Sequence, residues 1–480
     1  MRRPLVEAAR AGDVAAVRSL LRRDSAVNAQ ATDGTTALHW AARNDDQAMM
    51  TALLRAGAKA SLANRYGVTP IALAVANGSV AGTTLLLDAG ADANTTTGEG
   101  ESVLMTASRA GSVGVVKALL AKGAKVNGRE GWQDQTALMW AAAENHAEVV
   151  KALLEAGADK AARSKALDGM PPLRKTAPDV GQQGIHSTFP KGGLTALHLA
   201  ARQNAAAAVE ALAAGGANLD EGDPDGFTPV IFAILNAHYD LAALLVTKGA
   251  GVDTTDRAGR TPLYTAVDMN TFEYSFNRPN PRPSGRMTAV DLVKFLLAKG
   301  ANPNARLKDR VVPAKYDTAG NPNLIAGATP LMKAVSTSDV ELTKVLLAAG
   351  ADPFMRNAQH STMLHVAAGL NWRRLGGIGP EPDALETVKL LLEKGVDVHA
   401  VNDAGQTVLH AVAMRGRGGQ EEGPNTVESL DLIRYLVSRG ARLNAVDKAG
   451  RTPVQMAQFT RNVKALALLS ELSAPTVAGR

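Results

Sequence analysis

Histidine is the residue type in this sequence whose regular spacing first suggests a catalytic or metal-binding site. Four of the nine histidines stand three residues after a threonine, in "TALH", "TALH", "TMLH" and "TVLH"; they are His39, His198, His365 and His410. Histidine serves as a general base or a metal ligand. None of the four, however, has a second ligand at the spacing of a helical zinc motif. His360 lies five residues before His365, and we expect one in a turn and the other on a helix, which disfavours a metal pair.

Two glycine-rich stretches could bind phosphate or nucleic acid. "GGIG" at 376–379 neither follows a strand nor opens a helix, so it does not fit a phosphate-binding loop. "RGRGG" at 415–419 is a single copy beside two glutamates, which is a weak nucleic-acid tract. No serine–histidine–aspartate set or carboxylate pair stands out. The sequence therefore predicts no catalytic residues, no cofactor and no metal.

The composition excludes several other classes of protein. The 480 residues contain no cysteine, which rules out disulfides, thiolate catalysis and zinc–cysteine sites. No apolar run reaches the roughly 18 residues of a membrane span, so we expect no membrane insertion. The N-terminus lacks the apolar segment of a signal peptide. The sequence as given thus favours the cytoplasm, or the periplasm or secretion if a signal peptide was removed.

The helices that would have to position such a site recur in a repeating pattern along the chain. Eleven helix starts are marked by threonine or serine, most of them 33 or 34 residues apart, and longer intervals indicate insertions. These residues are Thr36, Thr69, Ser102, Thr136, Thr195, Thr228, Thr261, Thr329, Thr362, Thr407 and Thr452. Threonine and serine cap helix N-termini, and proline follows at five of these starts, where its missing N–H has no cost.

A glycine after an apolar run marks the end of each second helix, because glycine takes the left-handed conformation that terminates a helix. The ten glycines are Gly57, Gly90, Gly123, Gly157, Gly216, Gly249, Gly300, Gly350, Gly395 and Gly440. Turn-like stretches such as "DPDGFT" and "DKAGRT" separate the units. Each unit therefore reads as a turn followed by two short helices.

The segments "DGTTALHWAA", "GLTALHLAA" and "GQTVLHAVA", closed by "GADAN" or "GAKVN", resemble the ankyrin-repeat signature over the whole chain. The alanine-rich variant is similar to bacterial ankyrin proteins. The resemblance implies an all-α ankyrin-repeat solenoid of helix–turn–helix units joined by β-hairpin-like turns. We expect one solenoid over 1–480, with an N-terminal cap at 4–32, about ten repeats over 33–448 and a C-terminal cap at 449–480.

The resemblance also implies roles for individual residues. The four periodic histidines would bridge neighbouring units by hydrogen bonds near the helix start. Trp40 and Trp140 follow that position, and repeat-core packing accounts for them. Such a stack implies a monomeric, non-enzymatic scaffold that binds another protein through its concave face and hairpin tips.

Five stretches do not belong to the repeat: 165–192, 271–287, 306–327, 370–384 and 415–427. They contain 12 of the 22 prolines, which predicts loops rather than hidden helices. Their charges of +2, +2, +2, 0 and 0 account for the whole formal charge of +6. We expect 271–287, 370–384 and 415–427 between the two helices of a unit, lined up along one rim. The other two fall between units.

These observations leave three hypotheses. The insertions and first helices could bind a protein partner, the insertions could be length variation without function, or an enzyme or small-molecule site could be built from them around His186, Tyr274 or Tyr316. Weak nucleic-acid binding is disfavoured, because two excess charges per loop do not make a basic stripe. The candidate partner-binding residues are Phe272, Tyr274, Phe276, Arg278, Arg282, Trp372, Arg43, Asn44, Arg109, Glu144, Asn145, Arg202, Gln203, Asn236 and Asp268.

Overall fold

The computed structural model describes residues 4–23, 26–166, 192–270, 282–309, 324–370, 381–414 and 430–474. Contacts divide the chain into two compact units, and each is described by itself. Unit 1 comprises the described residues up to 166 together with 192–219, and unit 2 comprises those from 220 onward. Regular structure in the described parts is helical, with four isolated β-bridges between residues near the hairpins.

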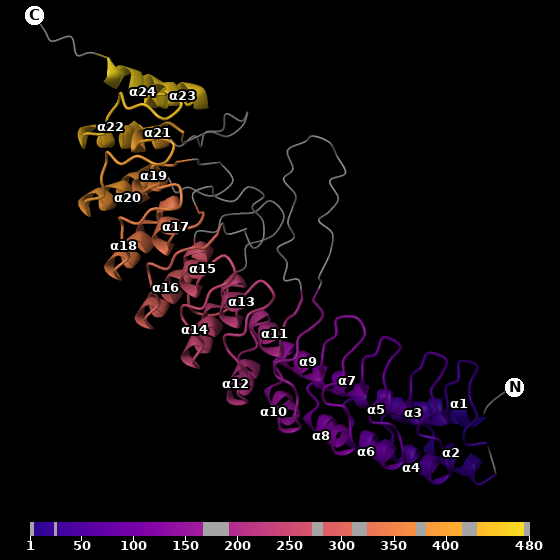
Figure 1. Ribbon diagram of the computed structural model, residues 1–480. Coiled ribbons are helices and arrows are strands. Elements are labelled where there is room, and N and C mark those ends of the chain that lie inside the picture. The colour runs from indigo at the N-terminus through magenta and orange to yellow at the C-terminus, as the bar shows by residue number, and fades with distance from the viewer. Residues whose placement is uncertain are drawn as a thin grey trace, which may run out of the picture. The chain divides into compact units, whose positions relative to one another are not determined.

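In each unit the helices alternate between two rows, which we call first helices and second helices (Figure 1). In unit 1 the first helices are α1 (Pro4–Arg10), α3 (Ala37–Arg43), α5 (Pro70–Ala76), α7 (Val103–Arg109), α9 (Ala137–Ala143) and α11 (Ala196–Arg202). The second helices are α2 (Val14–Leu21), α4 (Gln47–Arg55), α6 (Val80–Asp88), α8 (Val113–Ala121), α10 (Ala147–Glu155) and α12 (Ala206–Ala214).

Unit 2 repeats the arrangement. Its first helices are α13 (Pro229–Leu235), α15 (Pro262–Asn270), α17 (Pro330–Ser336), α19 (Met363–Ala367), α21 (Val408–Ala413) and α23 (Pro453–Thr460). Its second helices are α14 (Tyr239–Thr247), α16 (Ala289–Ala298), α18 (Val340–Ala348), α20 (Glu381–Glu393), α22 (Leu430–Ser438) and α24 (Val463–Ser473). The all-helical ankyrin-type architecture expected from the sequence is confirmed.

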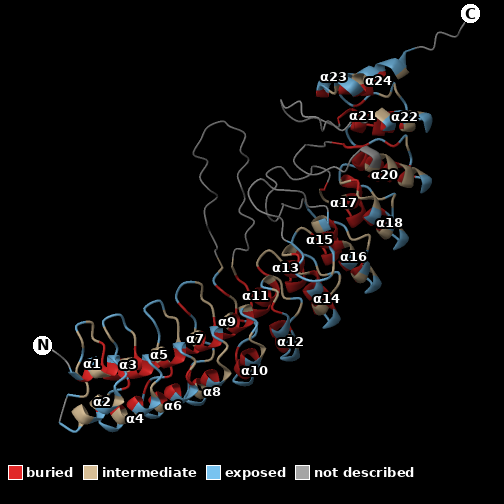
Figure 2. Cartoon of the chain, turned by 180° about the vertical axis from the view of Figure 1, so that it is seen from behind, coloured by how far each residue is buried: buried red, intermediate tan, exposed pale blue. Residues whose placement is uncertain are grey.

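One leucine per repeat occupies the centre of each core. It stands four residues before the terminal glycine and is 0% exposed in all ten repeats. These residues are Leu53, Leu86, Leu119, Leu153, Leu212, Leu245, Leu296, Leu346, Leu391 and Leu436. Buried residues gather where first and second helices face one another and where neighbouring pairs meet (Figure 2). Each apolar face is thus covered by its own pair and by the next, as stacked repeats require.

The same leucine takes part in ending its helix. Gly90 has a φ of 87°, and the N–H of Ala91 donates to the Leu86 carbonyl at 2.9 Å. This six-to-one bond across a left-handed glycine is a Schellman motif. All ten glycines predicted to end second helices have positive φ, so that prediction is confirmed.

The connections between repeats are closed by an aspartate or asparagine. The Asp447 carboxylate accepts hydrogen bonds from the N–H groups of Ala449 and Arg451, each at 2.9 Å. Asn64 does the same for Tyr66 and Val68, each at 3.0 Å. This local side-chain turn is the favoured use of these residue types.

Three of the predicted insertions are partly ordered repeat structure in the described residues. The Gly193 N–H donates to the Lys165 carbonyl at 3.2 Å, and the Leu307 N–H donates to the Ala328 carbonyl at 2.9 Å, so the ends of the stretches 165–192 and 306–327 belong to hairpin stems. Helix α20 begins at Glu381, inside the stretch 370–384 that we expected to be loop. Proline at 382 is compatible with this, because proline is tolerated in the first turn of a helix.

The left-handed glycines give a direct stability prediction. Gly90→Ala should lower unfolding stability by about 1 kcal/mol, because an L-residue is strained at φ 87°. Gly98→Ala is the matched control, since a Cβ at either position meets no atom within 4 Å and only Gly90 has positive φ. Urea unfolding followed by circular dichroism measures the two midpoints. Equal midpoints would contradict the assignment.

Candidate protein-binding surface

The periodic histidines hold repeats together rather than forming a reactive site. The Thr36 N–H donates to His39 Nδ1 at 3.2 Å, so Nδ1 is unprotonated. The ring proton therefore lies on Nε2, which donates to the Val68 carbonyl of the next repeat at 3.0 Å. His365 makes the equivalent bond to the Gln406 carbonyl at 2.8 Å. The bridging role implied by the resemblance is confirmed for these residues.

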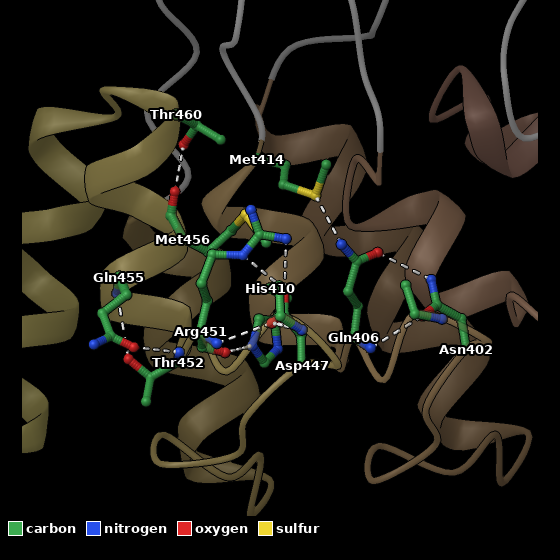
Figure 3. A network of polar contacts seen from close by, with 12 residues as sticks. Asn402, Gln406, His410, Met414, Asp447, Arg451, Thr452, Gln455, Met456 and Thr460 are labelled. Carbon is green, nitrogen blue, oxygen red and sulfur yellow. Dashed lines mark hydrogen bonds and ion pairs between the residues drawn. The ribbon is translucent and has the colours of Figure 1, made fainter.

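Figure 3 shows this bridge in the last repeats of unit 2. His410 Nε2 donates to the Arg451 carbonyl at 2.8 Å. The same Arg451 donates from Nε to Asp447 at 3.0 Å, so the histidine bond and the hairpin turn are parts of one network. Burial lowers the pKa of His410 below its usual value and lowers the pKa of His365 to about 4. These rings stay neutral near pH 7 and bind neighbouring repeats instead of shuttling protons.

The described residues also lack a metal site. His360 is in the turn, with φ 52°, as expected, and its Nδ1 lies 2.8 Å from the Asp403 carboxylate on the surface. No group of three or more potential metal-ligand side chains occurs within the described ranges. His186, Tyr274 and Tyr316 of the alternative enzyme site lie outside those ranges. Among the described helices, none is long and apolar enough to cross a membrane.

The first helices of unit 1 expose an aromatic and cationic surface. Trp40 is the fourth residue of α3, and the guanidiniums of Arg10 and Arg43 lie 5.3 and 5.4 Å from its ring centroid. Trp140 is the fourth residue of α9, and Arg109 from α7 lies 4.9 Å from its ring. Core packing therefore describes these tryptophans only in part, because both are half-buried and carry arginines on their rings.

Two hairpin tips of unit 1 add exposed aromatic rings. Tyr66, between α4 and α5, is 73% exposed, and Trp132, between α8 and α9, is 74% exposed. The Trp132 tip is held by the buried Glu130 carboxylate, which accepts from the N–H of Trp132 at 2.6 Å and of Gln135 at 2.9 Å. An ordered turn thus presents a large ring to solvent. These two aromatics are absent from the residues predicted to bind a partner, although they stand where other hairpins carry acidic residues, glutamine or alanine.

The candidate residues of the 271–287 stretch are only partly described. Phe272, Tyr274, Phe276 and Arg278 lie outside the described residues, as does Trp372 in the next rim insertion. Arg282 is exposed at the start of the described part of this segment.

The segment that follows Arg282 is anchored to unit 2. Ser284 Oγ lies 2.8 Å from His238 Nδ1. The Met287 N–H donates to the Asp240 carboxylate at 3.1 Å. The downstream end of this insertion is therefore anchored at the N-terminus of α14.

The remaining candidates lie in or beside the first helices. Arg43, Arg109, Glu144 and Gln203 are exposed, and Arg202 is half-buried. Besides the arginine–tryptophan contacts given above, four candidates make polar contacts within the scaffold. Asn44 donates to the Ala9 carbonyl at 3.4 Å, Asn145 accepts from the Ala208 N–H at 2.9 Å, Asn236 donates to the Phe232 carbonyl at 2.8 Å, and Asp268 pairs with Lys333 at 2.7 Å.

Comparison with known proteins assigns the repeat. The family model described as "Ankyrin repeats (3 copies)" matches residues 5–97, 83–164, 178–256 and 197–307, more than half of the chain. This protein belongs to the ankyrin-repeat family. Related ankyrin models match 138–213 and 381–420, and 326–358 and 404–448. Ankyrin repeats are generally protein–protein interaction modules, and their fold is typically a non-enzymatic scaffold.

The similar proteins are ankyrin-repeat proteins of varied kinds. The B-cell lymphoma 3 protein homolog of Mus musculus is 26% identical over 40% of this chain and 38% of its own length. Protein PhlB of Serratia liquefaciens is 31% identical over 33% of this chain and 60% of its own. The human ASB11 ankyrin repeat domain is 26% identical over 52% of this chain and 99% of its own, with a TM-score of 0.42. The chain covers less than two-thirds of both curated relatives.

The histidine bridges predict a pH dependence of stability. The pKa of His365 is about 4 in the folded chain and near 6.5 when unfolded, so the unfolded state binds the proton first as pH falls. As the pH falls from 6.5 to 4, protonation of His365 in the unfolded state should lower the free energy of unfolding by about 3 kcal/mol. His365→Met removes this titration, and Met105 and Met139 already fill the equivalent position of their repeats.

Urea unfolding of the wild type and His365→Met at pH 7.5 and pH 4.5 tests this directly. Every other titrating group is common to the two proteins, so the comparison isolates the histidine. The stability advantage of the wild type should shrink at the lower pH. An unchanged difference would show that His365 does not titrate as a buried neutral ring.

Proposed function

We propose that this ankyrin-repeat protein is a non-enzymatic scaffold that binds a protein partner through the first-helix face and hairpin tips of unit 1. The observation that carries the proposal is the exposure of Tyr66 and Trp132 at hairpin tips of unit 1, together with the tryptophan–arginine contacts of α3 and α9. Tyrosine, tryptophan and arginine are the residue types enriched in interface hot spots. Burying such exposed rings against a partner would stabilise a complex by removing apolar surface from water.

The hairpin tips are already ordered before a partner binds, so binding should cost little conformational entropy. The Trp132 tip is fixed by the Glu130 carboxylate, and the Tyr66 tip by the Asn64 side chain. The hairpins are joined to their neighbours as well, since Arg65 donates to the Thr32 carbonyl at 2.6 Å. A preorganised surface loses less conformational entropy when it binds.

The insertions remain a second part of the proposed interface. Phe272, Tyr274, Phe276, Arg278, Arg282 and Trp372 have the composition of contact residues, and proline at 279, 281 and 283 limits the backbone freedom of the first stretch. We propose that they extend the same partner's contacts into unit 2.

Affinity capture from the source organism tests the unit 1 surface. The double variant Tyr66→Ser, Trp132→Ser should lose its partner, with affinity at least about tenfold lower for each hot-spot ring removed. Phe459→Ser, Val463→Ser is the matched control, since these apolar side chains are 57% and 73% exposed at the last repeat. Exposed substitutions of either pair should leave the helical circular dichroism unchanged. Loss of partners in the control but not in the first variant would refute this surface.

Deletion of residues 271–281 tests the insertion separately. This deletion keeps Ser284 and Met287, which are anchored to unit 2. The proposal predicts weaker capture of the same partner. An unchanged affinity would assign the insertion to length variation without a binding role.

A further inference from the structure

Two guanidiniums share one indole ring at the N-terminal end of unit 1. Arg10 reaches Trp40 from the neighbouring helix α1, and Arg43 reaches it from one turn further along α3. The two helices are tied together by the bond from Asn44 to the Ala9 carbonyl. We call these three side chains the Arg10–Trp40–Arg43 cluster.

The cluster holds two positive charges without a carboxylate partner. In the described ranges, no acidic side chain lies within 4 Å of either guanidinium, although Glu7 stands one turn before Arg10. Both guanidiniums lie within 5.4 Å of one ring centroid, so the distance between them cannot greatly exceed the Debye length of about 10 Å at 0.1 M salt. Their mutual repulsion is therefore only partly screened.

At two equivalent positions among the described residues, the charge is paired with one of opposite sign. Asp268 and Lys333 occupy the seventh and fourth positions of adjacent first helices, as Arg10 and Trp40 do, and form an ion pair at 2.7 Å. Arg109, which stacks on Trp140, has Glu101 at 3.4 Å. The Arg10–Trp40–Arg43 cluster differs from both by leaving its charge open to a ligand.

We propose that this cluster anchors an acidic side chain, aspartate or glutamate, from an extended segment of the protein partner. The inference rests on the proposed function and specifies the partner's chemistry. Each guanidinium presents planar N–H donors that match a carboxylate, and contact with the indole ring restricts where they lie. The ring would also pack against the methylene groups of the acidic side chain.

The length of the segment follows from the stacking of repeats. Trp40 and Trp140 are three repeats apart, or roughly 30 Å if adjacent helices pack about 10 Å apart. An extended peptide covers that distance with about nine residues. A segment of that length could reach from the cluster to the Trp140 and Arg109 contact.

Titration of the full-length protein with fluorescein-labelled decaglutamate, at 0.1 M salt, tests the anchor. Arg10→Gln, Arg43→Gln should weaken binding about tenfold or more, because charge-assisted hydrogen bonds are lost. Arg18→Gln, Arg22→Gln is the matched control; these two exposed arginines, in the second helix α2 and directly after it, give the same change in net charge, and binding should fall less than about twofold. Arg10→Glu, Arg43→Glu should bind labelled decalysine more tightly than the wild type does.

Three results would overturn the anchor: no binding of decaglutamate by the wild type, equal losses in both glutamine variants, or tighter, cluster-dependent binding of a deoxythymidine decanucleotide. The last result would indicate a nucleic-acid ligand instead. The proposed function is judged separately by partner capture with Tyr66→Ser, Trp132→Ser. The Tyr66→Ser, Trp132→Ser variant can lose its partner as predicted while decaglutamate binds equally well with and without Arg10 and Arg43. In that case the scaffold proposal stands and the acidic anchor is wrong.

Discussion

Stacking of neighbouring helix pairs is the interaction on which the rest of this structure depends. A pair of helices of five to thirteen residues is too short to be stable alone and cannot cover its own apolar face. Leu53 and its nine equivalents are completely buried because each lies between its own pair and the next. The His39 and His365 bonds to carbonyls of the following repeat add direction to that apolar contact. Neighbours are thereby held in register as well as in contact.

Such a scaffold separates residues that must be kept from residues that can vary. The threonine caps, terminal glycines and buried leucines satisfy helix ends and cores, so they recur in almost every repeat. The fourth and seventh residues of the first helices differ more between repeats. Among them are the arginine–tryptophan contacts of Arg10 with Trp40 and Arg109 with Trp140 in unit 1, and the Asp268–Lys333 ion pair in unit 2. One backbone geometry thus yields surfaces of different chemistry.

The elements set by local chemistry were predictable from the sequence. Thr36 and Gly90 act where the predicted helix ends lie, because capping and left-handed termination depend on a few neighbouring residues. The start of α20 at Glu381 was not predicted, since an extra helical turn can form inside an insertion without altering the repeat pattern.

The candidate surface was harder to predict. Trp40 looked like core packing, because sequence spacing does not show that Arg10 and Arg43 converge on its ring. Tyr66 and Trp132 were missed because exposure depends on how far each hairpin projects, and only the folded chain shows that. Conversely, Asn145 looked free for binding but caps the next repeat's second helix.

The central claim is that recognition lies on the first-helix face and hairpin tips of unit 1. Hydrogen exchange of the protein with and without a captured partner tests it most directly, since exchange reports each backbone segment. The account predicts slower exchange in the hairpins around Tyr66 and Trp132 and at the end of α3 when the partner is bound. Protection confined to the second helices α2, α4, α6, α8 and α10, with no change in those hairpins, would contradict it.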